Sequence, residues 1–329
     1  MGSTPPPPPR LHYLSDAEVR AAAPGPREVV ELLTRAFEER AAGRTEVPPK
    51  DGVHPVPGAL LHAMPASAPA LGAVGVKWIA AYPGNRAREL PAVSGLLVLN
   101  DPDTGLPVTV MDAAWITAIR TAAASVLSAR FLARREAASL GILGCGVQAR
   151  AHLAAFASAF RLQRVRVHDR HPERARALAE EMEALVGCHI GPAGQVREVV
   201  EGLDLVVTCG AIQRVPSGVV QPGWLAPGAF ASLVDFDSAW TAAALRELDL
   251  LATDDLPQLE RFREAGWFRD LPAVSVDLAA LVSGRIPGRT SAAQRTAACN
   301  LGLALEDVVV AGEVDRRARQ RGLGTPLLR

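Results

Sequence analysis

From residue 138 onward, short apolar runs alternate with helix-like stretches, and this alternation constrains the fold of the 329-residue chain more than any other feature. The runs at 139–143, 164–169 and 204–209 have the length and composition of buried strands, and residues 173–185 between them have helical character. Strands and helices in alternation are typical of a parallel sheet covered by helices on both faces. We therefore predict an α/β protein with a Rossmann-type doubly wound parallel sheet and a second, α+β domain.

The first strand of this series leads into a glycine-rich loop. Residues 144–149 fit the pattern G-x-G-x-x-G/A at the point where a predicted strand is followed by a predicted helix. Gly144 permits the tight turn, and Gly146 lets the backbone approach a pyrophosphate. The helix N-terminus at Val147 and Gln148 offers N–H donors and a partial positive charge. We predict that these four residues bind a dinucleotide; the alternative is a strand-to-helix turn that binds nothing.

An acidic residue ends the second strand at a suitable distance from the loop. Asp169 follows Gly146 by 23 residues, about where an acid that bonds an adenosine ribose is expected. Asp169 favours NAD, whereas the adjacent Arg170 suits the 2′-phosphate of NADP. Both residues are predicted to bind the cofactor, and the choice between NAD and NADP stays open, with a slight preference for NAD. The loop has no G-K-[ST], which disfavours a P-loop kinase or ATPase.

Composition excludes several other classes of function. Lys plus Arg and Asp plus Glu both number 35, so net charge gives no reason to bind nucleic acid or an anionic membrane. No apolar run reaches the roughly 20 residues that cross a bilayer. Residues 1–19 lack the pattern of a signal peptide and are expected to form an extended, poorly ordered Pro-rich leader.

The cysteines and histidines form no metal-binding motif. The four cysteines contain no C-x-x-C pair, and the seven histidines contain no H-x-x-x-H. We therefore expect no metal site, and buried thiols in a reducing cytoplasm.

Other segments predict the rest of the organisation. We expect a helix over 15–42 that breaks at 24–26, and a strand-rich region over 45–100. The turn at 101–105 predicts a hairpin between the runs on either side of it. Long helical patterns follow at 113–135 and at 295–320, and the last is expected to return to the first domain.

Three polar residues outside the loop stand in apolar or strand-end surroundings. Lys77 lies in an apolar strand, Arg120 in a helix of small residues, and Asp237 just beyond a predicted strand. Lys77 and Arg120 suit an anion, and ligands of such sheets bind beyond the carboxyl ends of the strands. The alternatives are that Lys77 extends to solvent, that Arg120 forms a structural ion pair and that Asp237 caps the N-terminus of a helix. The pattern alone does not separate these interpretations.

The chain resembles the ornithine cyclodeaminase/mu-crystallin family over nearly its whole length. The residues that carry the resemblance are GVKWIAAYPGN (75–85), LNDPDTGLPVTVMDAAWITAIRTAA (99–123), GILGCGVQARAHL (141–153), SGRIPGR (283–289) and LGLALEDV (301–308). The resemblance implies a Rossmann domain over 128–294. It also implies a split substrate-binding and dimerisation domain made of 1–127 and the returning helix in 295–329. It further implies nicotinamide chemistry beside a carboxylate, and a homodimer.

Matched by position, the resemblance assigns roles to several residues. Lys77 and Arg120 correspond to residues that bind the substrate carboxylate, and Lys50 stands where the family often has Arg or Lys for this purpose. Met64 resembles a pocket-lining methionine, and Asp237 resembles the acid/base. The further predicted contact to the cofactor is Thr121.

The chain departs from the cyclodeaminase pattern next to the acid. Those members have a lysine in the stretch that here reads Asp235-Phe236-Asp237-Ser238-Ala239-Trp240-Thr241. The lysine is absent and a tryptophan replaces a glycine, which weakens the case for ornithine as substrate. Asp235 becomes a rival for the acid/base role.

Three functions follow, in order of preference. The first is an NAD(P)-dependent oxidoreductase of an α-amino or α-imino acid, acting by imine reduction or oxidative deamination, with Asp237 and Lys77 in catalysis. The second is a cyclodeaminase for ornithine or lysine that recycles its NAD. The third is a mu-crystallin-like protein that binds NAD(P)H and a small molecule without turnover.

Overall fold

The computed structural model describes residues 11–328, and the chain divides into two compact units. One unit holds the described residues up to Gly25, Ala42–Thr117 and those from Leu303 on; the other holds Pro26–Ala41 and Ala118–Gly302. The predicted domain boundaries at 127/128 and 294/295 stay a prediction. In the structure, residues 26–41 group with the second unit rather than with the N-terminal part.

The second unit, here called the nucleotide unit, is built on a parallel sheet, which confirms the predicted Rossmann-type α/β fold. The strand order is β13-β12-β14-β11-β10-β7-β8-β9, and each neighbouring pair is parallel. The strands are β7 (Ser139–Leu143), β8 (Arg164–His168), β9 (Ile190–Pro192), β10 (Leu205–Thr208), β11 (Phe230–Leu233), β12 (Leu250–Thr253), β13 (Val276–Asp277) and β14 (Thr296–Ala298). The order in which the chain adds strands to the sheet reverses between β7 and β10, because β8 and β9 lie on one side of β7 and β10 lies on the other. Sheets of this kind bind ligands at such a switch point, beyond the carboxyl ends of the strands.

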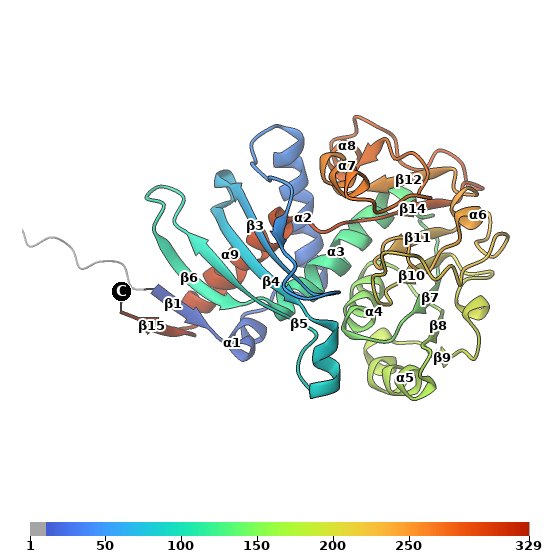
Figure 1. Cartoon of the computed structure of the whole chain (residues 1–329), viewed down its shortest axis with the longest axis horizontal. Coiled ribbons are helices and arrows are strands. Elements are labelled where there is room, and N and C mark those ends of the chain that lie inside the picture. Colours follow the sequence, from blue (N-terminus) through green and yellow to red (C-terminus); the bar gives the residue numbers. More distant parts are fainter. Residues whose placement is uncertain (1–10, 329) are drawn as a thin grey trace, which may run out of the picture. The chain divides into compact units, whose positions relative to one another are not determined.

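Helices cover this sheet (Figure 1). They are α2 (Pro26–Ala41), most of α3 (Ala114–Leu132), α4 (Val147–Ala159), α5 (Pro172–Val186), α6 (Ala242–Leu245), α7 (Leu256–Glu264) and α8 (Leu278–Val282), with the short η3 (Val196–Val199). Strand β10 is fully buried along its length, as expected for a central strand covered on both faces.

The first unit, here called the mixed-sheet unit, has a seven-stranded sheet in the order β15-β1-β6-β5-β4-β3-β2. Its strands are β1 (Leu11–Leu14), β2 (Asp51–Val53), β3 (Leu60–Ala68), β4 (Ala73–Ala81), β5 (Val93–Asn100), β6 (Pro107–Asp112) and β15 (Thr325–Leu327). Its helices are α1 (Asp16–Ala21), η1 (Pro69–Leu71), η2 (Pro83–Arg88) and α9 (Ala304–Gln320). Helix α9 packs on one face of the sheet, against β3, β4 and β5 (Figure 1).

Several predicted elements are confirmed. The predicted N-terminal helix is interrupted between Ala21 and Pro26, because proline lacks an N–H and is favoured at the first position of a new helix. Strands β5 and β6 pair antiparallel across the predicted turn. Helix α9 returns to the mixed-sheet unit, as expected.

Two predictions are wrong in part. The segment 295–320 is not helical throughout: Thr296–Ala298 forms β14 between β11 and β12, and α9 begins only at Ala304. The three residues of β14 are fully buried, and backbone pairing on both sides outweighs their helical pattern. The expected leader lies mostly outside the described residues, but Leu11–Leu14 forms β1, which pairs with β6 and β15.

Candidate functional site

The loop between β7 and α4 has a backbone that its glycines make possible. Gly144 has φ +97°, and a Cβ there would lie 2.9 Å from the carbonyl oxygen of Cys209. Gly146 is the extended N-cap of α4, and a Cβ on it would meet no protein atom within 4 Å. No side chain caps the helix, and Val147 in its first turn is 68% exposed. The loop therefore offers open space beside helix N–H groups, as an anion requires.

Asp169, which follows β8, forms hydrogen bonds that hold this loop in place. Its Oδ2 accepts a hydrogen bond from the Cys145 N–H at 2.9 Å, and its Oδ1 accepts one from the His171 N–H at 3.0 Å. Arg170 is exposed, and its Nε lies 3.2 Å from His171 Nε2. The structure thus brings Asp169 against the loop, while the Arg170 guanidinium lies at the surface.

A chain of buried polar side chains supports the first turn of α4. His152 Nδ1 lies 2.7 Å from the Gln148 carbonyl oxygen, and His152 Nε2 lies 2.9 Å from Ser125 Oγ. The hydroxyl of Ser232 donates to Ser125 Oγ at 2.8 Å. Burial lowers the pKa of His152 to about 4, so the ring is neutral near pH 7 and donates from Nδ1 to the carbonyl. Helix α4 is thereby tied to α3 and β11.

The side chain of Gln148 itself fits a ligand. Its Oε1 is buried and has no hydrogen-bond partner among residues 11–328. A buried acceptor without a donor is costly, and a ligand hydroxyl or amide would remove that cost. The residues around Gly146 therefore fit a bound dinucleotide.

Two buried carboxylates follow β11 in the loop 234–239. Asp235 and Asp237 are each 3% exposed. Asp235 accepts hydrogen bonds from Thr208 Oγ1 at 2.6 Å and from the Gly210 N–H at 3.3 Å. Trp240 Nε1 donates to the same threonine oxygen at 3.2 Å, which gives the tryptophan noted in the sequence a place in this network. Burial raises the pKa of Asp235 to about 6 in spite of these donors.

Asp237 is held differently. Burial raises its pKa, and repulsion from Asp270 adds to the rise, while its own backbone N–H opposes it. Asp237 is therefore a carboxyl with few protein donors and a raised affinity for a proton, as a proton-transfer group requires.

In the mixed-sheet unit, Lys77 forms a fully buried ion pair. Its Nζ lies 2.5 Å from Oδ2 of Asp307, in the first turn of α9, and the two side chains are 1% and 0% exposed. Met64 is the register partner of Lys77 on the neighbouring strand and is also buried. The structure thus brings two predicted residues together and adds Asp307.

Lys50 lies in the loop before β2 and is half-buried. Burial lowers the pKa of His62 to about 4, and the nearby positive charges of Lys50, His54 and Lys77 contribute. Lys50, Lys77 and His62 are therefore close enough to interact, although His62 was not among the residues predicted from the sequence.

Arg120 lies on α3 and is 7% exposed. Its guanidinium is packed against Gly302, where an added Cβ would lie 2.5 Å from Nη1. The Gly302 N–H donates to Oδ2 of the buried Asp254 at 2.6 Å. Thr121, the next residue on α3, is half-buried, and its carbonyl accepts from Ser125 Oγ at 3.2 Å.

Within each unit, the structure groups most of the predicted residues. Gly144, Gly146, Val147, Gln148 and Asp169 share one end of the nucleotide unit, with Arg170 beside them at the surface. Sequence reasoning missed Asp307, Asp254 and His62. The one local signal was the pair Glu306-Asp307 within the otherwise apolar stretch 301–312. Among residues 11–328 no group of three or more His, Cys, Asp or Glu suits a metal ion.

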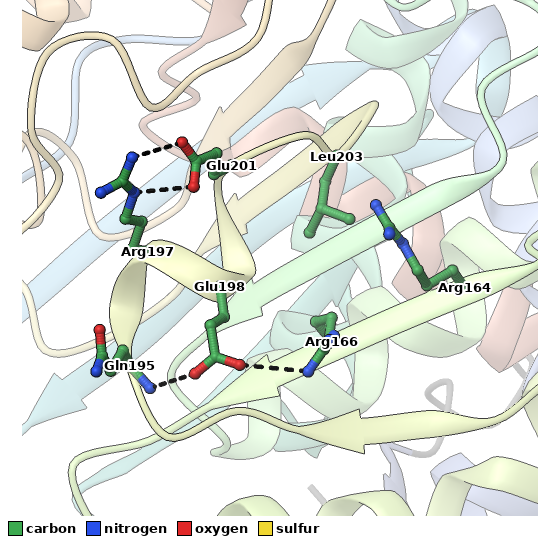
Figure 2. Close-up of a pocket in the computed structure, with 7 residues that line it drawn as sticks. All are labelled: Arg164, Arg166, Gln195, Arg197, Glu198, Glu201 and Leu203. Atoms are coloured by element: carbon green, nitrogen blue, oxygen red, sulfur yellow. Dashed lines mark hydrogen bonds and ion pairs between the residues drawn. The ribbon is translucent and has the colours of Figure 1, made fainter.

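A pocket elsewhere on the nucleotide unit contains none of the predicted residues (Figure 2). It is lined by Arg164, Arg166, Gln195, Arg197, Glu198, Glu201 and Leu203. Figure 2 shows Arg197 paired with Glu201 and Arg166 paired with Glu198, at 2.7 and 3.4 Å. These arginines already have carboxylate partners, so the pocket is not a candidate for the main site.

Comparison with known proteins identifies the family and similar structures. The model of the ornithine cyclodeaminase/mu-crystallin family matches residues 16–322. The chain is 33% identical to the nodulation efficiency protein NfeD of Rhizobium meliloti over 89% of this chain and 91% of that protein. Its structure is similar to Δ1-pyrroline-2-carboxylate reductase of Thermococcus litoralis in complex with NADH and L-proline (TM-score 0.87, 29% identity, 96% and 100% covered). It is also similar to an archaeal alanine dehydrogenase dimer with bound NAD (TM-score 0.86, 28% identity, 97% and 99% covered).

In the part of the chain that the structure describes, no helix is both long enough and apolar enough to span a membrane.

Proposed function

Because the chain belongs to the ornithine cyclodeaminase/mu-crystallin family, we propose that it is an NAD(P)-dependent oxidoreductase of an α-amino or α-imino acid. The reaction is imine reduction or oxidative deamination, and the bound nicotinamide supplies or accepts the hydride at the substrate Cα. The similar solved structures are of enzymes whose names describe this chemistry, with NADH and L-proline in one and NAD in the other.

The observation that carries the proposal is the loop around Gly146. Open space, uncapped N–H groups of α4 and the buried Gln148 oxygen together fit a dinucleotide. We propose NAD rather than NADP, because the Asp169 carboxylate at the loop would repel a 2′-phosphate. Arg170 is the residue that would favour NADP, so the dissociation constants of NADH and NADPH, measured by fluorescence, test this choice.

The family resemblance assigns Arg120, Lys77 and Lys50 to the substrate carboxylate and Met64 to the pocket lining, and we keep these assignments as part of the proposal. A planar guanidinium offers two parallel hydrogen bonds to a carboxylate and so fixes the orientation of the Cα. Asp307 compensates the charge of Lys77 and holds its ammonium group in place. We therefore assign orientation to Arg120 and charge to the lysines.

Asp237 is the proton-transfer group in this proposal. Asp235 is the weaker candidate, because Thr208 and Gly210 already donate to both of its oxygens. The Asp237 carboxylate accepts a hydrogen bond from its own backbone N–H. Its raised pKa allows it to hold a proton closer to neutral pH than an ordinary aspartate does.

Nicotinamide absorbance tests the function directly. Purified protein would be mixed with amino acids and NAD or NADP, and with 2-oxo acids plus amines or cyclic imino acids and NADH or NADPH. We expect a net absorbance change for one pair, its loss in Asp237→Asn with cofactor binding intact, and wild-type rates in Asp103→Asn, a variant of an exposed turn. Ammonia release from ornithine or lysine without an absorbance change would instead show a cyclodeaminase. Ligand-dependent thermal stabilisation without turnover would show a binding protein.

We also propose a homodimer formed through the mixed-sheet unit. Helix α9 covers one face of its sheet, whereas Trp78 and Leu96, paired across β4 and β5, are 44% and 43% exposed. Exposed apolar sheet faces of this kind mark interaction sites, and the similar alanine dehydrogenase is described as a dimer. Light scattering during size-exclusion chromatography should give twice the mass of the chain, and Trp78→Arg should reduce it to one chain. A monomeric wild type would refute the dimer.

A cytoplasmic location is part of the proposal. The four cysteines are free, and three of them are buried, as in proteins of reducing compartments. Fractionation of cells that express a tagged chain would test the location.

A further inference from the structure

Two phenylalanines of the nucleotide unit have left-handed backbone conformations. Phe236 has φ 61° and Phe268 has φ 55°, values that bulky side chains rarely adopt. Both are buried, at 6% and 4% exposure. Backbone strain of this kind persists only where the surrounding structure holds it, and it is concentrated at functional sites.

The two strained residues hold one another. Their ring centroids are 5.1 Å apart. Phe262 and Trp267 complete an aromatic cluster around Phe236, at 5.7 and 6.1 Å. Aromatic rings at these separations attract one another beyond the burial of their area. The contact with Phe268, the shortest of the three, therefore holds Phe236 in its unfavourable conformation, and Phe262 and Trp267 pack around the pair.

Each strained residue lies within two residues of an aspartate. Phe236 stands between Asp235 and Asp237, and Phe268 precedes Asp270 by two residues. Asp235 accepts hydrogen bonds from Thr208 and Gly210. The charge of Asp270 contributes to the raised pKa of Asp237. The Phe236–Phe268 contact thus joins the loop that carries Asp237 to the loop that carries Asp270.

We propose that Phe236 is a positioning residue for Asp237: its ring, locked against Phe268, holds the strained turn that separates the two carboxylates and keeps Asp237 in its buried position. The role of Asp237 in turnover rests on the function proposed above, but its position does not. The titratable groups around Asp237 are Asp235 on its own loop, Asp270 from the loop after α7, and Cys299 next to β14. Release of the turn would move the Asp237 carboxylate from its buried position toward solvent.

Substitutions at Phe236 separate conformation from packing. Alanine removes the ring but still disfavours φ 61°, whereas glycine removes the ring and tolerates that angle. If the ring serves to hold the turn, Phe236→Ala should lower kcat about tenfold and Phe236→Gly less. If the ring serves only packing, the two variants should lose the same activity or glycine should lose more.

Phe262→Ala is the matched control. Phe262 belongs to the same cluster, but it lies within α7, has no left-handed φ and is not in the loops that carry Asp235, Asp237 and Asp270. We expect this variant to lose thermal stability as the Phe236 variants do, while its kcat and the pH dependence of kcat stay those of the wild type. A shift of the pH profile in Phe262→Ala as large as in Phe236→Ala would contradict a specific role.

The deciding measurement is the titration of the Asp237 carboxyl by ¹³C NMR, assigned with Asp237→Asn. In Phe236→Ala we expect the midpoint to move down toward that of an ordinary aspartate, and in Phe262→Ala to stay unchanged. An unchanged midpoint in Phe236→Ala would overturn the inference, whatever the kinetics. Full turnover by Asp237→Asn would instead overturn only the proposed acid/base role, and the titration would still decide the position.

Discussion

Lys77 and Asp307 form an ion pair that is almost completely removed from solvent, with 2.5 Å between Nζ and Oδ2. Strand β4 supplies the cation and the first turn of α9 supplies the anion, so the pair ties the returning C-terminal helix to the sheet. A carboxylate near a helix N-terminus is also favoured by the helix dipole. The pair explains how a lysine in an apolar strand is tolerated.

Removal of one partner from this pair should be more harmful than removal of both. Asp307→Leu removes the carboxylate that faces a buried ammonium group, and such losses cost about 3–5 kcal/mol of unfolding free energy. Lys77→Met combined with Asp307→Leu should recover much of this cost, because neither charge then remains buried. Urea unfolding of the wild type, both single variants and the double variant gives the coupling. Additive losses would show that the two charges do not stabilise one another.

The two glycines of the cofactor loop should respond differently to alanine. Gly146→Ala meets no protein atom within 4 Å and has an ordinary φ, so stability should hold while NADH binding weakens about tenfold or more. Gly144→Ala has φ +97° and contacts the Cys209 carbonyl, so this variant should lose about 1–3 kcal/mol of stability. Thermal unfolding and NADH fluorescence, measured side by side, compare them. Equal losses of stability would contradict the assignment of Gly146 to the cofactor.

Features encoded in neighbouring residues could be predicted from the sequence. The strand, glycine loop and helix around Gly144 and Gly146 follow from local spacing, and so does the hairpin of β5 and β6. The partner of Lys77 could not be predicted without the fold, because Asp307 lies near the other end of the chain. Strand β14 has only three residues, too few for a periodic pattern, and is defined by β11 and β12 on either side. The strained conformation of Phe236 has no local signal, since the ring that holds it belongs to Phe268, in another loop of the chain.

Asp235 should make stability fall as the pH rises. Burial raises its pKa from 3.8 to about 6, so between these values the folded chain holds a proton that the unfolded chain has released. Unfolding free energy therefore decreases with pH in this window and is level below it, where both states are protonated. The difference in unfolding free energy between the wild type and Asp235→Asn should fall by roughly 2 kcal/mol from pH 4 to pH 7.

The difference between the two proteins is the useful quantity, because His152 acts with the opposite sign. Burial lowers the pKa of His152 to about 4. The unfolding free energy that this ring contributes is therefore lost as the pH falls below the pKa of an ordinary histidine. Both proteins contain His152, and its effect cancels in the comparison. Denaturant titrations at several pH values supply the data. A difference that does not change with pH would show that Asp235 has an ordinary pKa.

Gly302 should be required for the position of the Arg120 guanidinium. A Cβ at this residue would lie 2.5 Å from Arg120 Nη1, and φ is +81°, so Gly302→Ala combines strain with a displaced guanidinium. If Arg120 orients the substrate carboxylate, KM for the amino acid should rise about tenfold, the scale of one lost charge-assisted hydrogen bond. Gly284→Ala is the matched control, because its φ is +69° and a Cβ there meets nothing within 4 Å. Steady-state kinetics should show a changed KM only in Gly302→Ala, with the NADH dissociation constant unchanged in both. A similar KM change in Gly284→Ala would point to general strain, and no change in either variant would remove Arg120 from substrate binding.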